Sequence, residues 1–510
     1  MDGGSTWVQL ASASGGASTG RIALALGFIP DLYNDSLYEA VSSPITGGLY
    51  YLGRSDNPSD ATPTFTNLTA GTPDFLGGEN PKPAGSQMSG QGWYDIAVAA
   101  DAQGNVFCAG VEDYLQGAVG TQYIEYSWDQ GADWLDISKL AGVEPHTDAH
   151  ALSLDSADGL LIGTDGGIWY NDASGSSWAN LNGNLNTIQF YEIGLHPTST
   201  TTVVGGSQDN GTDLYNNNTV WSQTQGGDGG FAQFSQTKPS RCYAAHPNVE
   251  ALFQSSDSGC ATGSWVTETS GFVNTNSNFT APFVVDRTIG DHLLIGFDRV
   301  YETTDAAAHW IPISTPQSNG FNSSGKNVDS VALSPANGTN PQVVYASTGG
   351  SFVNLSQIFV TTNDGNSWAE RDLPACTGGS HYSLGCRVNQ IVVDANDPTG
   401  MTAVAVTNNF TGRSGGHVYR TTNGGTSWTD IGSGLPDLPT WSVQVDNDEY
   451  HTLYISNDTG VYSSPSPYTA WSPFGTGLPN AQGRDLELNS VLRVLAVATH
   501  GRGVWEMQLP

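Results

Sequence analysis

The sequence has 510 residues, of which 38% are hydrophobic and 13% charged, and 49 acidic against 16 basic residues give a net charge of −33. Such a charge repels phosphate backbones and anionic membranes, so nucleic acid is excluded as an expected partner. No apolar run reaches the roughly 18 residues that a membrane-spanning helix needs, so no membrane partner is expected.

The polar residues indicate a protein that works outside the cell. Ser, Thr and Asn dominate the polar composition and lysine is rare, which is typical of an extracellular and acid-tolerant chain. Cys242 with Cys260, and Cys376 with Cys386, bracket short segments and predict two local disulfides, leaving Cys108 as a buried strand thiol. The sequence begins without a signal peptide, and we expect it to be a secreted, mature form from which an export signal was removed.

Short strands of alternating burial recur along the chain at a spacing of about fifty residues, the period of a four-stranded propeller blade. In chain order they are residues 21–26, 94–100, 150–155, 191–196, 230–235, 282–286, 330–335, 390–395, 441–446 and 484–489. Strand signals outnumber any helical period. The sequence therefore predicts an all-β protein built from about ten copies of one unit.

Each unit ends in a polar turn closed by an aromatic residue. The clearest copies are Ser127–Trp134, Thr303–Trp310, Thr361–Trp368 and Thr421–Trp428, which fit Ser/Thr-x-Asp/Asn-x-Gly-x-x-Trp with Ala replacing Gly once. The hydroxyl and the Asp/Asn side chain can bond backbone N–H groups of the turn, and the Trp ring can be buried between neighbouring sheets. This pattern resembles the Asp-box, or BNR repeat, of β-propellers.

The two ends of the chain predict how the propeller closes. The last three strands, within residues 484–509, lack a following box, whereas the chain opens with the box Asp2–Trp7. We therefore expect residues 1–510 to form one domain, a single ring of about ten blades resembling the sortilin-type propeller, whose closing blade is shared between the termini. The alternative is two smaller propellers, as in the xyloglucanases of glycoside hydrolase family 74.

Acids concentrate on the rim that carries the turns between the second and third strands. The candidate catalytic carboxylates are Asp148, Asp165, Asp209 and Asp228. A pair of carboxyl groups is what glycoside hydrolysis requires, one to protonate the leaving oxygen and one to activate water or attack. The segment containing Asp165, TDGGIW, resembles the catalytic turn of family 74, so Asp165 is the first candidate for the base. Two of these segments, at Asp165 and Asp209, are also good hairpin turns in their own right.

Aromatic and hydrogen-bonding residues of the same rim predict a sugar-binding surface. The expected substrate-binding residues are Trp93, Tyr94, Asp95, His146, His150, Trp169, Tyr191, Gln208 and Arg502. His146, Asp148 and His150 alternate, so in an extended segment they share a face and could bind a sugar or a divalent metal. No metal ligand set and no cofactor is predicted, with calcium kept as the one metal left open.

Three functions remain open. The first is a secreted, monomeric glycoside hydrolase acting on a polysaccharide of β-glucan or xyloglucan type. The second is a polysaccharide lyase that uses His146 or His150 with Tyr94, and the third is a sortilin-like binding propeller without activity. A sialidase is disfavoured, because the Phe/Tyr-Arg-Ile-Pro motif of that family is absent and the early arginine, Arg21, lies in GRIAL.

Overall fold

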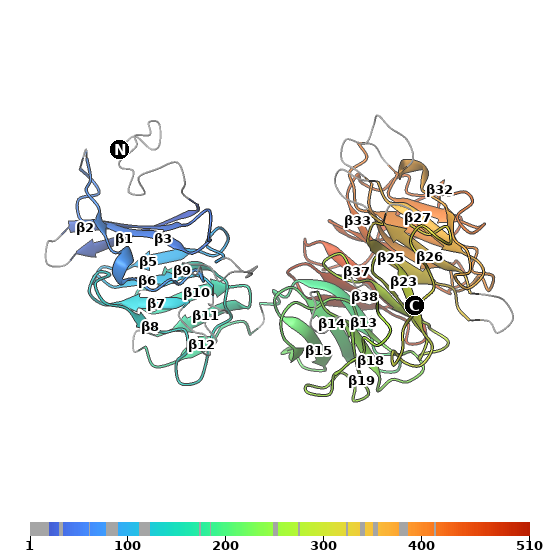
Figure 1. The fold of residues 1–510 in the computed structure, drawn as a ribbon, viewed down its shortest axis with the longest axis horizontal. Coiled ribbons are helices and arrows are strands. Elements are labelled where there is room, and N and C mark those ends of the chain that lie inside the picture. Colours follow the sequence, from blue (N-terminus) through green and yellow to red (C-terminus); the bar gives the residue numbers. More distant parts are fainter. Residues whose placement is uncertain are drawn as a thin grey trace. The chain divides into compact units, whose positions relative to one another are not determined.

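The computed structural model divides the chain into two compact units, Met1–Leu185 and Asn186–Pro510 (Figure 1). The described residues are 20–29, 34–60, 62–77, 90–111, 123–172, 175–183, 185–247, 253–273, 276–322, 325–336, 342–349, 355–376, 386–412 and 415–510. Each unit consists of small antiparallel sheets and is considered separately.

The first unit contains three four-stranded sheets. The first sheet holds β1 (Ile22–Ile29), β2 (Asn34–Ser42), β3 (Leu49–Ser55) and β4 (Thr66–Asn67), followed by a 3-10 turn, η1 (Thr69–Gly71). The second holds β5 (Ala97–Ala100), β6 (Val106–Ala109), β7 (Ile124–Ser127) and β8 (Leu135–Asp136). The third holds β9 (Ala149–Leu154), β10 (Leu160–Thr164), β11 (Gly167–Asn171) and β12 (Trp178–Asn180).

The second unit contains seven sheets, six with four strands and the last with three. The first three are β13 (Phe190–Leu195), β14 (Thr202–Ser207), β15 (Gly211–Asn216) and β16 (Ser222–Gln225); β17 (Ala232–Phe234), β18 (Cys242–Ala245), β19 (Phe253–Ser256) and β20 (Val266–Thr267); and β21 (Phe283–Val285), β22 (Leu293–Gly296), β23 (Val300–Thr303) and β24 (Ile311–Pro312). Next come β25 (Val328–Leu333), β26 (Val344–Thr348), β27 (Gln357–Thr361) and β28 (Ala369–Glu370), then the 3-10 turn η2 (Pro374–Cys376). The last three sheets are β29 (Val388–Val393), β30 (Ala403–Thr407), β31 (Val418–Thr421) and β32 (Thr429–Asp430); β33 (Thr440–Val445), β34 (Leu453–Asn457), β35 (Gly460–Ser464) and β36 (Ser472–Pro473); and β37 (Gly483–Asn489), β38 (Val494–Thr499) and β39 (Val504–Gln508).

The seven sheets of the second unit close on themselves. The innermost strand β13 packs against both β17 and β37, and Phe190, Ile193 and Leu195 share a buried cluster with Val494 and Ala496 of the last sheet. Apolar residues of adjacent sheets thus cover one another around the whole ring.

The all-β class, the four-stranded blade and the number of about ten sheets are confirmed. Their arrangement differs from the expected single ring, because seven of the sheets close among themselves and the other three belong to a separate compact unit. The predicted pairing of Asp2–Trp7 with the last sheet falls outside the described residues and stays a prediction.

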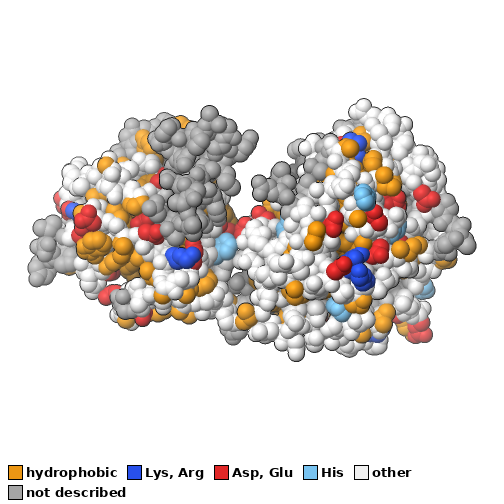
Figure 2. Space-filling view, turned by 60° about the horizontal axis from the view of Figure 1, so that its bottom comes forward, with side chains coloured by type: hydrophobic (Ala, Val, Ile, Leu, Met, Phe, Trp, Pro, Cys, Tyr) orange, Lys and Arg blue, Asp and Glu red, His pale blue; other side chains and the backbone are white. Residues whose placement is uncertain are grey.

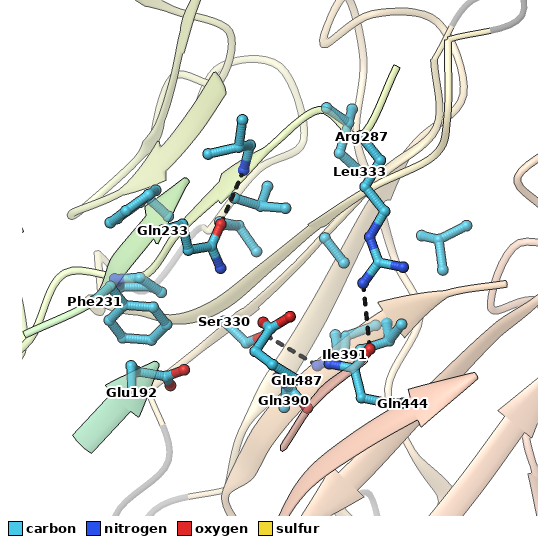
Figure 3. A pocket seen from close by; sticks show the side chains of 18 of the residues that line it. Glu192, Phe231, Gln233, Arg287, Ser330, Leu333, Gln390, Ile391, Gln444 and Glu487 are labelled. Carbon is cyan, nitrogen blue, oxygen red and sulfur yellow. Dashed lines mark hydrogen bonds between the residues drawn. The ribbon is translucent and has the colours of Figure 1, made fainter. Parts of the chain in front are cut away.

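A belt of polar side chains joins the inner strands of the second unit. In each case a side-chain oxygen accepts a backbone N–H of the next sheet (two of these bonds are drawn in Figure 3). The pairs are Gln233 with Val285 (3.4 Å), Ser330 with Ile391 (3.0 Å), Gln390 with Val443 (2.7 Å), Ser442 with Leu486 (2.9 Å) and Asp485 with Ile193 (3.1 Å). The last pair joins the two ends of the ring, so Asp485 is a closing contact.

The polar turns have the predicted local geometry. Thr421 Oγ1 donates to Asn423 Oδ1 (2.9 Å) and accepts the Gly425 N–H (3.0 Å), while Asn423 Oδ1 accepts the Ser427 N–H (2.9 Å). Trp428 Nε1 donates to the backbone oxygen of Arg371 in the preceding sheet (2.8 Å). The hydroxyl and Asp/Asn bonds recur in the turns that begin at Ser127, Thr303 and Thr361. The indole N–H of Trp134 is the exception among these four turns, because it is buried without a hydrogen-bond partner in the described part of the chain. Each turn therefore fixes a hairpin and aims one ring between two sheets.

Both predicted disulfides are present, Cys242–Cys260 and Cys376–Cys386, and Cys108 is a buried free thiol. Among the described residues, no helix is long and apolar enough to cross a membrane. On the face shown in Figure 2, much of the described surface is white, which marks the backbone and side chains that are neither charged nor hydrophobic. This agrees with the low content of charged residues.

Replacing Thr421 by Val should destabilise the second unit by about 1–2 kcal/mol, because the Gly425 N–H loses its acceptor inside a buried turn. Thr422→Val is the matched control, since Thr422 is exposed and its change should stay within about 0.5 kcal/mol. Chemical denaturation measures both variants, and equal midpoints for the two would contradict this role of the hydroxyl.

The buried acidic side chains make the stability of the folded protein depend on pH. Burial raises the pKa of Glu125 and of Glu487 to about 8 and that of Asp213 to about 7. In the unfolded chain these groups ionise near pH 4. Between about pH 4 and 8 the unfolded state therefore binds fewer protons than the folded state, and stability falls as the pH rises.

We expect the melting temperature to be higher at about pH 5 than at about pH 8. Glu125→Gln should flatten part of this slope, whereas Glu144→Gln, at a surface pair with Lys139, should not. Calorimetry across this range tests the expectation, and a higher melting temperature at the alkaline end would contradict it.

Candidate functional site

A β-bulge recurs at the start of the inner strands and places one extra residue there. In the first unit Ala149 pairs with Thr164 and Ala151 with Gly163, so His150 is skipped. The same skip in five inner strands of the second unit falls on Tyr191, Asp329, Asn389, Trp441 and Arg484. A bulge re-aims its extra side chain. In every case it lies beside the turn between the second and third strands, on the rim where the sequence predicts function.

His150 is the centre of a carboxyl cluster in the first unit. Its Nε2 lies 2.7 Å from Asp165 Oδ1 and 3.4 Å from Asp95 Oδ1. Gln91 Nε2 donates to Asp148 Oδ1 (3.1 Å), and the Asp165 N–H donates to the Asp148 backbone oxygen (3.3 Å). Asp148 also has a positive φ of 63°, a strained conformation for a residue with a side chain. The structure thus brings Asp148, Asp165 and His150, three of the candidate residues, close together.

The members of this cluster differ in their affinity for protons. Burial, with the nearby Asp148 carboxylate, raises the pKa of Asp95 to about 8. Burial and the Asp165 charge also raise the pKa of Asp148. The hydrogen bond to Asp165 raises the pKa of His150, although burial opposes this. At neutral pH the Asp95–Asp148 pair therefore holds a proton, and the contact with Asp165 favours the protonated form of His150.

Aromatic rings border the cluster. Tyr94 contacts the His150 ring edge-on, with centroids 4.7 Å apart, and Trp93 follows at 5.6 Å from Tyr94 with 62% of its surface exposed. His146 packs on Gly166, where an added Cβ would lie 2.3 Å from the His146 Cβ. Trp169 packs against the hydrophobic core of this unit and does not join the cluster.

The remaining candidates lie in the second unit. Tyr191 has ring centroids 5.7 Å from Phe279 and 6.4 Å from His500. Burial, with the charges of Asp228 and Asp209, raises the pKa of Tyr191 to about 12.

Their backbone contacts are those of tight turns. The Asp209 N–H donates to Asp228 Oδ1 (3.0 Å), so the Asp228 side chain caps the turn that contains Asp209. Gln208 donates its N–H to the Gln189 backbone oxygen. Arg502 donates to the Gly501 backbone oxygen (2.6 Å) in a neighbouring turn.

Two arginines at this rim, Arg387 and Arg484, were not among the predicted site residues. Arg484 is itself a bulge residue, and Arg387 directly precedes β29. An alignment of the inner strands on their bulge position would have found Arg484, because it occupies the place of His150 and Tyr191.

The carboxyl cluster can carry out acid–base chemistry at one place. It offers an acid pair that holds a proton, the carboxyl group of Asp165 fixed by His150, and exposed rings beside them. Among the described residues, no three His, Cys, Asp or Glu side chains are grouped so as to hold a metal ion.

No family model and no curated protein matches this sequence. Solved structures with a similar fold include the family 74 glycoside hydrolase of Niastella koreensis, at 14% identity and a TM-score of 0.28, covering 95% of this chain and 90% of that one. YCF48 from Cyanidioschyzon merolae is similar at 10% identity and a TM-score of 0.43, covering 64% of this chain and 96% of that one. The extracellular domain of the one-component system BT4673 from B. thetaiotaomicron is similar at 12% identity and a TM-score of 0.42, covering 95% and 57%. Likenesses at these identities and TM-scores carry no inference about activity.

The pairing of His150 with Asp165 can be tested without any substrate. Asp165→Asn should lower the pKa of His150, because the asparagine side chain keeps the contact and loses the charge that favours the histidinium ion. Asp133→Asn, at an exposed position of the same unit, should leave it unchanged. NMR titration of the histidine ring protons measures both, and an unshifted His150 in the Asp165 variant would refute the pairing.

Proposed function

We propose that this propeller is a secreted glycoside hydrolase acting on a polysaccharide, with its catalytic groups in the carboxyl cluster of the first unit. The observation that carries the proposal is the contrast between two neighbouring aspartates. Asp148 belongs to a pair that keeps a proton at neutral pH, whereas Asp165 is held against His150 at 2.7 Å. Glycoside hydrolysis needs one carboxyl group in each of these states.

In this mechanism Asp148 gives its proton to the glycosidic oxygen while the C–O bond breaks. Asp148 is the more exposed member of the acid pair, since Asp95 is fully buried. Burial and the Asp165 charge favour the protonated form of Asp148, and the buried Asp95, whose own pKa is raised to about 8, is a positioning residue beside it. Asp165 acts on the sugar carbon, either through an activated water or directly, and His150 stabilises its negative charge.

The surroundings support a carbohydrate as the substrate. Trp93 and Tyr94 present exposed rings next to His150, and flat rings of this kind can stack on the apolar faces of sugars. The hydrogen bonds of the four polar turns support their assignment as Asp-boxes. The two disulfides and the scarcity of lysine support a secreted location.

A polysaccharide lyase is the second candidate, and the ring contact between Tyr94 and His150 favours it. A base and a phenol in contact could take the proton next to a uronic acid carboxylate and return one to the leaving oxygen. The product would carry a new C=C bond, whereas a hydrolase would add water and leave the sugar saturated.

Incubation of the purified protein with a panel of neutral and uronic-acid polysaccharides tests the proposal. New reducing ends without ultraviolet absorbance are expected, and Asp148→Asn and Asp165→Asn should each lower the rate by about 10²–10⁴-fold. Asp133→Asn is the control and should retain full activity. Absorbing products would favour the lyase, and no product from any polysaccharide would contradict both enzymes and favour a binding propeller.

A further inference from the structure

The mouth of the second unit carries a group of side chains that the carboxyl cluster does not include. The bulge residues Asp329, Asn389, Trp441, Arg484 and Tyr191 belong to five successive sheets around the closed ring. Asp329, Asn389 and Trp441 also line a central cavity of about 130 Å³. Five blades therefore present one re-aimed side chain each around the same opening.

Arg484 is a largely buried cation at this opening. Its guanidinium carbon lies 4.0 Å from the centre of the Trp441 ring. Trp441 is held in turn by a hydrogen bond from Nε1 to Asp458 Oδ1 (2.7 Å). Arg484 makes no hydrogen bond or ion pair with any side chain in the described part of the chain. Several donors of its guanidinium fork are therefore left for a ligand.

A second arginine increases the positive charge at the same place. Burial is the largest cause that lowers the pKa of Arg484, and the nearby charge of Arg387 lowers it further, whereas Glu192 and Tyr191 act in the opposite direction. Its Nη2 is 3.2 Å from Asp329 Oδ1, whereas its Nε is buried without a hydrogen-bond partner among the described residues. Two neighbouring cations in one partly desolvated opening favour an anion between them.

The acidic side chains further inside the ring neutralise only part of the positive charge of the two arginines. Figure 3 shows Glu192 and Glu487 on different strands around the cavity, with Arg287 above them bonded to Gln444 (3.2 Å). Burial raises the pKa of Glu192 well above its usual value and that of Glu487 to about 8. Glu487 is therefore largely neutral at pH 7 and burial disfavours the charge of Glu192, so the two arginines keep a net attraction for anions.

We propose that the mouth of the second unit binds the carboxylate of an acidic sugar, a uronic acid residue, through Arg484 and Arg387. The fork of a guanidinium matches a carboxylate in two parallel hydrogen bonds. Trp441 and Tyr191 provide rings beside it, and Phe279, half exposed, extends this aromatic surface next to Tyr191. The choice of a sugar as the carrier of the carboxylate rests on the function proposed above.

Binding is measured by isothermal titration on the full chain in the Asp165→Asn background, so that the proposed catalysis plays no part in the result. The probes are a galacturonic acid disaccharide, the neutral disaccharide cellobiose and sodium propionate. The acidic disaccharide should bind at least about tenfold more tightly than cellobiose, as expected for a charge-assisted pair. Propionate should bind weakly, because it has the carboxylate without the ring.

Arg484→Gln and Arg387→Gln should each weaken binding of the acidic disaccharide by at least about tenfold. Arg371→Gln, which removes a charge elsewhere in the same unit, should leave it unchanged. Circular dichroism confirms that each variant is folded. Equal binding of cellobiose, an unchanged affinity of the Arg484 variant, or no binding of the acidic disaccharide would overturn the proposal. None of these results bears on the activity assay, which depends on Asp148 and Asp165.

Discussion

Both proposed sites contain a residue that one backbone irregularity places there, the β-bulge at the start of the inner strands. A regular antiparallel pair would alternate its side chains between two sheet faces, both of which are covered by neighbouring blades. The bulge adds a residue that escapes this alternation and lies at the rim. His150 in the first unit and Arg484 in the second occupy this position. The repeat thus provides the same place in several blades, and the residue type decides what each blade contributes.

Two buried aspartates show how their surroundings give one residue type different properties. Asp485 follows the bulge residue Arg484 and accepts the Ile193 N–H and the Ser442 hydroxyl. These bonds favour its charge, and burial raises its pKa only to about 6. Asp95 lies beside the Asp148 carboxylate, which together with burial raises the pKa of Asp95 to about 8. Asp485 therefore closes a ring of blades, whereas Asp95 belongs to a carboxyl pair that holds a proton at neutral pH.

The fold could be predicted further than the site. Alternating strands and polar turns are local patterns, so the sheets, the turns and both disulfides follow from the sequence. The grouping of His150 with Asp165 could also be predicted from the sequence, since the two residues lie at the same end of two paired neighbouring strands. The closure of seven sheets was not, because it depends on packing between Phe190 and Val494, which are far apart in the chain. Arg387 and Arg484 were missed because their neighbourhood exists only after five blades come together.

The central claim is that the Asp95–Asp148 pair holds one proton at neutral pH while the Asp165 charge favours the protonated form of His150. Carbon-13 NMR of the aspartate side-chain carboxyl groups at pH 7, assigned through single Asp→Asn variants, tests it most directly. The account predicts a protonated signal that belongs to the Asp95–Asp148 pair and an ionised signal for Asp165. Three ionised carboxylates, or a protonated Asp165, would contradict it.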